Sequence, residues 1–261
     1  MSVLDEILES KREEIARLRR RAPEMEAEAR GLPAPRSFTA ALRRPDGHLA
    51  VIAEIKRRSP SKGDLAPELD PAAVASAYAT GGAACLSVLT DVEFFGGSVA
   101  DLQAARSAVE LPVLRKDFTV SERDVYDARI MGADAVLLIA AALATSELSR
   151  FREVAAALGM TALVEVHDAD ELSRALAAGA DVIGVNQRDL RTFDVDRELA
   201  ARLAAKMPDG VVTVAESGIR DAGDVTRLVD AGYDAILVGE SLVTSPDPAD
   251  AVRALTLEDR R

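Results

Sequence analysis

"TALVEVHDADELSRALAAGADVIGVN" (residues 161–186) contains one complete strand–helix–strand unit of this chain. Its first six residues are a mostly apolar run, and residues 169–180 carry Leu and Ala at helical spacing. Gly179 follows the helical pattern at the place where a left-handed cap typically ends a helix, and the next apolar run begins almost at once. The stretch therefore predicts two parallel strands joined by a helix.

The same unit recurs along the chain, and "MGADAV", "AGADVI" and "AGYDAI" mark three of its helix-to-strand junctions. Because the runs are continuously apolar, both faces of the predicted sheet should be buried under helices. Eight runs, with no GxGxxG after the first, favour a closed (β/α)8 TIM barrel over an open dinucleotide-binding sheet. The predicted strands are residues 50–56, 85–90, 112–118, 135–140, 161–166, 182–188, 211–217 and 235–241.

The residues before the first run predict a helical extension of about 45 residues. We expect one (β/α)8 domain over residues 1–261, divided into an extension (1–49) and the barrel (50–261). The extension begins with an amphipathic helix that could plug the bottom of the barrel or cover its catalytic end, and residues 21–38 read as a polar connector. The apolar stripe is Leu4, Ile7, Leu8, Ile15 and Leu18, with Ser2 and Asp5 as a capping box.

Net charge, hydropathy and cysteine content limit the molecules that this protein is expected to bind and the compartment that it is expected to occupy. The net charge of −12 argues against nucleic-acid binding, so the basic residues 56–62 suit a small anionic ligand. No run of 18 apolar residues predicts a membrane span, and the charged N-terminus does not resemble a secretory signal. A single cysteine, Cys85, is expected in the core and fits a reducing compartment. We therefore expect a cytoplasmic protein that is a monomer or weak homodimer.

Charged residues end several predicted strands, and active-site groups of such barrels come from those ends. Alternation along the first strand turns Glu54 and Lys56 inward, and in the fifth strand it turns Glu165 inward. The facing of Lys116 is ambiguous, because Arg115 and Asp117 flank it. Asn186, Arg188 and Glu216 end two further strands.

One such charge is usually solvated or salt-bridged. Several buried charges at one mouth are costly for stability, however, and instead indicate a site for proton transfer.

The seventh and eighth strands end in "AESG" and "VGES", where barrels of this kind often bind phosphate through backbone N–H groups. Gly218 and Gly239 allow a close backbone approach, and Ser59 and Lys56 could complete that site. Phe94, Phe95 and Phe118 could be ordinary packing residues or could form an apolar slot for a planar ring at the same mouth. The only histidines, His48 and His167, lack clustered partners, so no metal is expected and His167 reads as a loop residue.

Six segments in consistent order resemble the signature segments of the indole-3-glycerol phosphate synthase family: "IAEIKRRSPSKG", "LPVLRKDF", "ALVEVH", "GVNQRDL", "VAESGI" and "VGESL". The resemblance runs from about residue 2 to residue 250. It implies conversion of 1-(2-carboxyphenylamino)-1-deoxyribulose 5-phosphate to indole-3-glycerol phosphate, with loss of CO2 and water. It implies no metal or organic cofactor and a small phosphorylated molecule as the substrate.

By its place in these segments, Lys116 would be the general acid at the ketone oxygen. Glu165 and Glu54 would move protons at that oxygen and the amine, with Lys56 beside them. The remaining implied residues bind substrate hydroxyls, carboxylate, phosphate or ring. They are Asn186, Arg188, Glu216, Ser217, Ser59, Gly218, Gly239, Glu240, Phe95 and Phe118.

Two features depart from the family pattern. Some members place an aromatic residue of the N-terminal helix against the substrate, but here the first aromatic residue is Phe38. Glu240 follows Gly239 where small hydroxyl residues are common, and a carboxylate there would repel phosphate. Its side chain is therefore expected to point away, with only its N–H contributing. The alternatives are another phosphosugar barrel, such as phosphoribosylanthranilate isomerase, and a barrel that binds a phosphorylated ligand without turnover.

Overall fold

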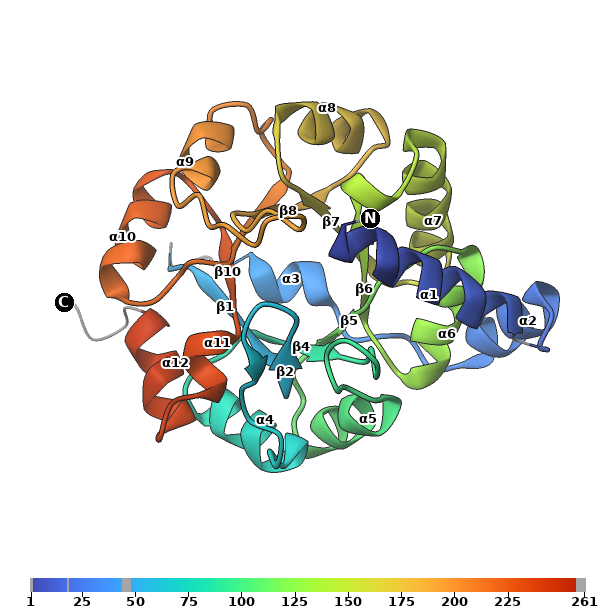
Figure 1. Ribbon diagram of the computed structural model, residues 1–261, viewed down its shortest axis with the longest axis horizontal. Helices are drawn as coiled ribbons and strands as arrows, with labels where there is room; N and C mark the ends of the chain where they lie inside the picture. The colour runs from blue at the N-terminus through green and yellow to red at the C-terminus, as the bar shows by residue number, and fades with distance from the viewer. Residues whose placement is uncertain (1, 18, 44–47, 257–261) are drawn as a thin grey trace.

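Parallel strands close into a barrel in the computed structural model, which describes residues 2–17, 19–43 and 48–256. Within these residues the barrel has eight strands in the order β1-β10-β9-β8-β7-β6-β5-β4, which confirms the predicted (β/α)8 TIM barrel (Figure 1). Every barrel pairing is parallel, as in the β1–β10 pair that closes the ring. The strands are β1 (Ala50–Ile55), β4 (Cys85–Leu89), β5 (Val113–Lys116), β6 (Ala135–Ile139), β7 (Thr161–Val166), β8 (Val182–Asn186), β9 (Val212–Glu216) and β10 (Ala235–Val238).

Helices surround the barrel and return the chain to the next strand (Figure 1). Several begin at an Asp or Ser whose side chain accepts from the first-turn N–H groups, as Asp168 and Asp221 do. The three predicted glycine junctions adopt positive φ at Gly132, Gly179 and Gly232. The helices are α4 (Pro71–Thr80), α5 (Val99–Ala108), α6 (Glu122–Met131), α7 (Thr145–Ala157), α8 (Ala169–Ala177), α9 (Leu199–Ala204), α10 (Ala222–Asp230), α11 (Glu240–Val243) and α12 (Pro248–Thr256). A short hairpin of β2 (Arg58–Ser59) and β3 (Gly63–Asp64) follows β1, and a 3-10 turn, η1 (Ala140–Ala142), follows β6.

Alternation along the strands divides the core into two clusters. Ala53, Ile55 and the outward-facing residues of the other strands pack against the helices. Ile52 lies with Leu114 and Leu163 inside the barrel. Cys85 is buried in the inner cluster, as predicted. This alternation also means that inward positions near the carboxyl ends of the strands face the mouth of the barrel.

Three helices precede β1: α1 (Val3–Arg17), α2 (Ala22–Gly31) and α3 (Phe38–Leu42). The interpretation of residues 21–38 as a connector was wrong, because they contain all of α2 and the start of α3. The capping box of α1 is confirmed by reciprocal hydrogen bonds between Ser2 and Asp5. Leu4, Ile7 and Leu8 are buried as predicted and Ile15 is half-buried, while Leu18 lies outside the described residues.

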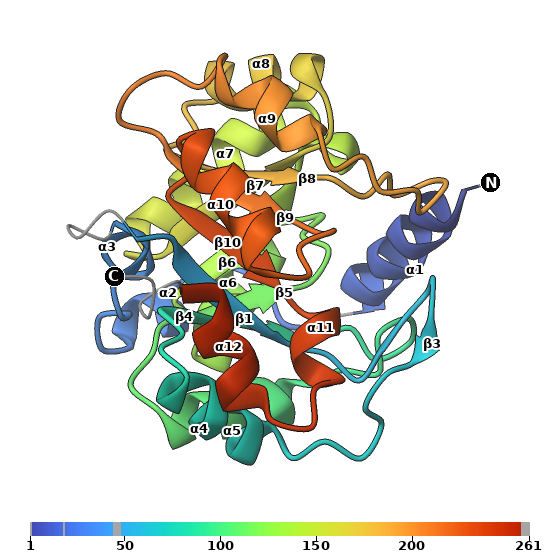
Figure 2. The same ribbon diagram turned by 90° about the vertical axis from the view of Figure 1, so that its left-hand side faces the viewer.

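The two ends of the barrel are covered by different helices of this segment. Phe38 and Leu42 of α3 are fully buried against Ala50 and Ile52 at the amino ends of the strands, so α3 plugs the bottom. α1 instead contacts the loops after β4 and β5, through Ser10 and Lys11. Figure 2 shows α1 and α3 on opposite sides of the barrel. The choice between plug and cover is thereby resolved, with α1 at the catalytic end.

Candidate active site

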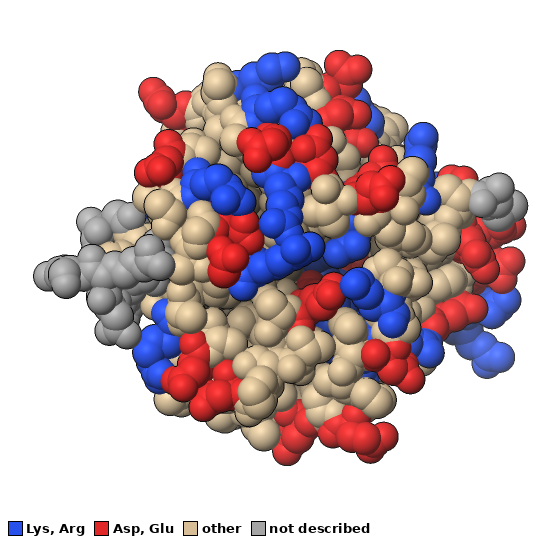
Figure 3. All heavy atoms as spheres, turned by 60° about the vertical axis from the view of Figure 1, so that its left-hand side comes forward, with Lys and Arg blue, Asp and Glu red and all other residues tan. Residues whose placement is uncertain are grey.

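A cavity of about 600 Å³ opens at the carboxyl ends of the strands. Lys and Arg side chains gather near the centre of this side of the molecule, bordered by Asp and Glu side chains (Figure 3). All fourteen residues predicted for the site line this one cavity: Glu54, Lys56, Ser59, Phe95, Lys116, Phe118, Glu165, Asn186, Arg188, Glu216, Ser217, Gly218, Gly239 and Glu240. Elements distant in the sequence are therefore brought together as the barrel predicts, while the role of each residue stays a prediction.

The deepest group is an ammonium between two carboxylates. Lys116, at the end of β5, places Nζ 3.5 Å from Glu165 Oε2 on β7 and 4.0 Å from Glu216 Oε2 on β9. Both glutamates are almost completely buried. The ambiguity about Lys116 is resolved, because Lys116 lines the cavity, whereas Arg115 does not and pairs with Asp117.

A second ion pair lies on β1, where Lys56 Nζ is 2.6 Å from Glu54 Oε1. The inward facing predicted for both side chains is confirmed, since both line the cavity. Two glycines make room for the glutamates of the site. A Cβ atom at Gly239 would collide with the Glu54 carboxylate, and one at Gly184 would collide with that of Glu216.

The protonation of the site follows from burial and neighbouring charge. Burial raises the pKa of Glu216, and the negative charge of Glu165 raises it further, so Glu216 is the carboxyl that holds a proton. Burial also acts to raise the pKa of Glu165, but Lys116 and His167 outweigh it and keep that pKa below its usual value. The pKa of Lys116 is raised because its three glutamates outweigh the opposing effect of burial. The two carboxyls beside this one ammonium thus have pKa values shifted in opposite directions, with Glu216 the one that takes up a proton more readily.

The loops after β9 and β10 meet the loop after β1 at the rim. Ser217 and Gly218 both adopt positive φ, 65° and 74°, which turns this backbone sharply toward the cavity. The short helix α11 begins immediately after Gly239. Such exposed turns present N–H groups that suit an anion.

The expectation that the Glu240 side chain points away from a bound phosphate stays a prediction. Its carboxylate lines the cavity, 3.7 Å from Lys62 Nζ and 3.9 Å from Arg188 Nη2, because these two cations attract it. Arg57 and Arg58 serve the loops instead: Arg57 pairs with Asp101, and Arg58 donates to the carbonyl of Val92.

Phe95 and Phe118 form one wall of the cavity. Their ring centroids are 6.2 Å apart and the rings are inclined by 40°. Phe95 belongs to the loop after β4, and Phe118 to the loop after β5. Both rings therefore lie in the same cavity as Lys116.

Two residues of the site were not found from the sequence. His167, interpreted there as a loop residue, places Nε2 3.3 Å from Glu165 Oε1 and Nδ1 3.0 Å from Glu171 Oε2. Burial acts to lower the pKa of His167, but the two carboxylates raise it to about 10. Lys11 of α1 is buried against Asp91 and Asp117. The "VEVHDADE" segment carried a signal for His167, whereas nothing near Lys11 indicated its partners.

Residues 2–17, 19–43 and 48–256 contain neither a metal cluster nor a membrane-spanning helix. No group of three or more His, Cys, Asp or Glu side chains there could hold a metal ion. No helix in those ranges is long and apolar enough to cross a membrane.

The fold and the cavity define a (β/α)8-barrel enzyme with its ionisable groups at the carboxyl ends of the strands. The sequence profile of the family "Indole-3-glycerol phosphate synthase" matches residues 4–255. Curated proteins of that name from Parafrankia sp. and Chloroherpeton thalassium are 53% and 51% identical. They align over 98% and 94% of this chain and 95% and 96% of their own. The chain belongs to the indole-3-glycerol phosphate synthase family. It is an indole-3-glycerol phosphate synthase, a decarboxylating carbon–carbon lyase of tryptophan biosynthesis.

More distant solved structures share the fold. The chain resembles thiamine phosphate pyrophosphorylase from Pyrococcus furiosus at a TM-score of 0.60 and 17% identity, over 79% of this chain and 93% of that one. It also resembles N-acetylmannosamine-6-phosphate 2-epimerase from Clostridium perfringens at a TM-score of 0.61 and 15% identity, over 81% and 93%. These likenesses concern the barrel alone.

Proposed function

We propose that the cavity closes the indole ring of 1-(2-carboxyphenylamino)-1-deoxyribulose 5-phosphate, with Lys116 as the general acid. The observation that carries this proposal is the position of the Lys116 ammonium between Glu165 and Glu216 in a cavity that also holds Glu54. An arene is a weak nucleophile, so its attack on a ketone needs a cation aimed at the ketone oxygen.

Three bond changes complete the reaction. The ring carbon that bears the carboxylate bonds to the ketone carbon, and the ketone oxygen takes a proton from Lys116. Loss of CO2 returns the electrons of the broken carbon–carboxylate bond to the ring and restores its aromaticity. The new hydroxyl then leaves as water, with a proton from the adjacent carbon, and the indole is complete. Each step is a proton transfer or bond cleavage that side chains can assist, so the proposal uses no metal or organic cofactor.

The role of each glutamate in these steps follows from its protonation state. Glu165 is held ionised by Lys116 and His167, so it can accept a proton near the ketone oxygen. Glu54 also has a lowered pKa, because Lys56 and Lys116 outweigh its burial, and it can accept a proton at the amine. Glu216 remains protonated and holds the substrate without adding a second negative charge beside Glu165.

The rest of the cavity would hold the substrate. Backbone N–H groups at Gly218, Gly239 and Glu240, with the Ser59 hydroxyl, would bind the phosphate, as would Lys56 from below. The anthranilate ring would lie against Phe95 and Phe118. Asn186, Arg188 and Ser217 would contact the hydroxyls and the carboxylate. Once phosphate is bound, the Glu240 carboxylate would remain on Lys62, away from the anion.

We further propose that residues 1–261 form a single barrel domain with a helical extension over residues 1–49. Packing of α2 against α6, and of α3 into the bottom of the barrel, supports this. A cytoplasmic monomer or weak homodimer that binds no nucleic acid or membrane fits the net charge of −12.

Incubation of the purified protein with the carboxyphenylamino-deoxyribulose phosphate should produce indole fluorescence. The chain contains no Trp, so the product signal has no protein background of that kind. Phosphoribosylanthranilate is the matched control substrate, and its isomerisation should not be accelerated. Folded protein that binds the phosphate but forms no indole would favour the non-catalytic alternative, and isomerisation alone would favour the isomerase.

A further inference from the structure

A lysine of the first helix is buried at the mouth of the barrel. Lys11 is 7% exposed, although it belongs to a helix whose other charged residues face solvent. Its Nζ lies 2.9 Å from Asp91 Oδ2 and 3.2 Å from Asp117 Oδ1, with Glu14 Oε2 at 3.1 Å. Lysine is rarely buried in this way unless it is paired. The contact joins α1 to two loops that follow different strands.

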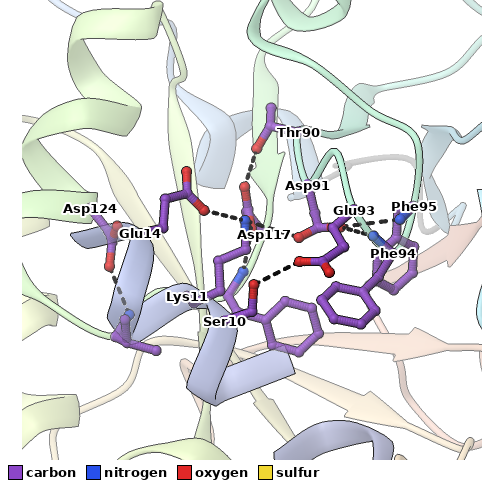
Figure 4. A network of polar contacts seen from close by, with 12 residues as sticks. Ser10, Lys11, Glu14, Thr90, Asp91, Glu93, Phe94, Phe95, Asp117 and Asp124 are labelled. Atoms are coloured by element: carbon purple, nitrogen blue, oxygen red, sulfur yellow. Dashed lines mark hydrogen bonds and ion pairs between the residues drawn. The ribbon is translucent and has the colours of Figure 1, made fainter. Parts of the chain in front are cut away.

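Each of the two aspartates also holds the backbone of an aromatic residue (Figure 4). Asp91 Oδ1 accepts from the N–H of Phe94 at 2.6 Å and of Phe95 at 3.1 Å. Asp117 Oδ1 accepts from the N–H of Phe118 at 2.8 Å. One ammonium therefore connects, through two carboxylates, the chain segments that carry both rings of the aromatic wall.

Charge neutralisation accounts for the contact of Lys11 with buried Asp91 but not for its contact with Asp117. Asp117 is already paired with Arg115, whose Nη2 lies 3.2 Å from Oδ2, and it also accepts from Thr90. Removing the ammonium would leave both aspartates buried without it, so the contact holds α1 firmly against the two loops. None of the described α1 residues lines the cavity, so Lys11 does not touch a bound molecule itself. What it supplies is a fixed distance between the two loops.

We propose that Lys11 is a positioning residue that sets the separation of Phe95 and Phe118 for the planar ring of the substrate. This proposal rests on the proposed function, in which those two side chains hold the anthranilate ring. The N-terminal helix thereby contributes to ring binding through a buried ion pair, in a chain whose first aromatic residue is Phe38.

The test is Lys11→Met, which keeps the aliphatic stem and removes the charge. We expect KM for the carboxyphenylamino-deoxyribulose phosphate to rise about tenfold, with kcat changed by less than about threefold, because ring contact is lost without loss of the acid. Hydrogen exchange should become faster in peptides covering residues 91–97 and 116–120. Arg17→Met is the matched control, since Arg17 lies on the same helix, is exposed and pairs with exposed Glu13. Arg17→Met should change neither KM nor hydrogen exchange in these peptides.

A double-mutant cycle separates positioning from a general loss of stability. If Lys11 acts through the ring, Phe95→Leu alone should raise KM, and Lys11→Met should add little to it. Additive effects on KM would overturn the proposal, as would unchanged KM and exchange in Lys11→Met. If Phe95→Leu leaves KM unchanged, the ring assignment of the proposed function fails and this proposal fails with it.

Asp91→Asn replaces Lys11→Met if that variant does not fold. It keeps the oxygen that accepts from Phe94 and Phe95 but removes the charge that pairs with Lys11. A several-fold increase in KM with kcat retained would support the proposal, and a KM within about twofold of the unaltered protein would overturn it.

Discussion

The two ends of this barrel are built from opposite kinds of residue. At the amino ends of the strands, Phe38 and Leu42 are completely buried in an apolar cluster with Ile52 and Leu114. At the carboxyl ends, the same inward positions carry a buried lysine among glutamates. The apolar end gains free energy from burial, whereas the charged end loses free energy by desolvation. Stability and chemistry are therefore separated along the barrel axis.

The largest expected effect is at the charged end. Lys116→Met should lower kcat/KM by about 10³-fold or more, because the cation at the ketone oxygen is lost. The fold should survive, since His167 still pairs with Glu165 and Glu216 is already neutral. Steady-state kinetics and thermal unfolding measure the two effects separately.

The exposed Lys206→Met is the control for Lys116→Met and should leave both quantities unchanged. Near-normal turnover in folded Lys116→Met would remove Lys116 as the acid. That result would also contradict the separation of chemistry at the charged end from stability at the apolar end.

A change at the apolar end should lower stability and leave the activity of the folded protein nearly unchanged. Phe38→Ala should lower the free energy of unfolding by about 3–5 kcal/mol, because it leaves a cavity in the plug of the barrel. The kcat of the protein that remains folded should stay within about twofold, since Phe38 lies at the far end from Lys116. Denaturant unfolding tests the first part, with the half-exposed Val229→Ala as a control. A large loss of kcat would show that the ends are coupled.

The smallest expected effect is a pH dependence at the charged end. Glu165 and Glu171 raise the pKa of His167 to about 10. The positive charge of His167 therefore stabilises the fold fully below about pH 6.5, and this stabilisation is lost as the pH rises through about 10. His167→Gln should therefore be less stable near pH 6, on the order of a few kcal/mol, and should approach the unaltered protein near pH 10. If the difference in free energy of unfolding between His167→Gln and the unaltered protein is the same at about pH 6 and about pH 10, His167 is not charged in the folded protein.

Much of the site followed from two rules applied to the sequence. Continuous apolar runs predicted the parallel barrel, and period-two alternation turned Glu54, Lys56 and Glu165 inward. Strand ends, loop glycines and aromatic residues indicated most of the others, resemblance to the family added Ser217 and Glu240, and all fourteen line one cavity. The ion pairs of Glu240 could not be predicted from the sequence, because Lys62 and Arg188 come from other loops.

The sequence by itself determined the strands, their order along the chain and the face that each residue presents, because these depend on local periodicity. Only the tertiary structure decided that α1 covers the mouth while α3 plugs the bottom. An amphipathic helix has an apolar face whichever end it covers. The protonation of Glu216 and the burial of Lys11 were likewise decided by neighbours from distant elements, because pKa values and ion pairs depend on distances in space.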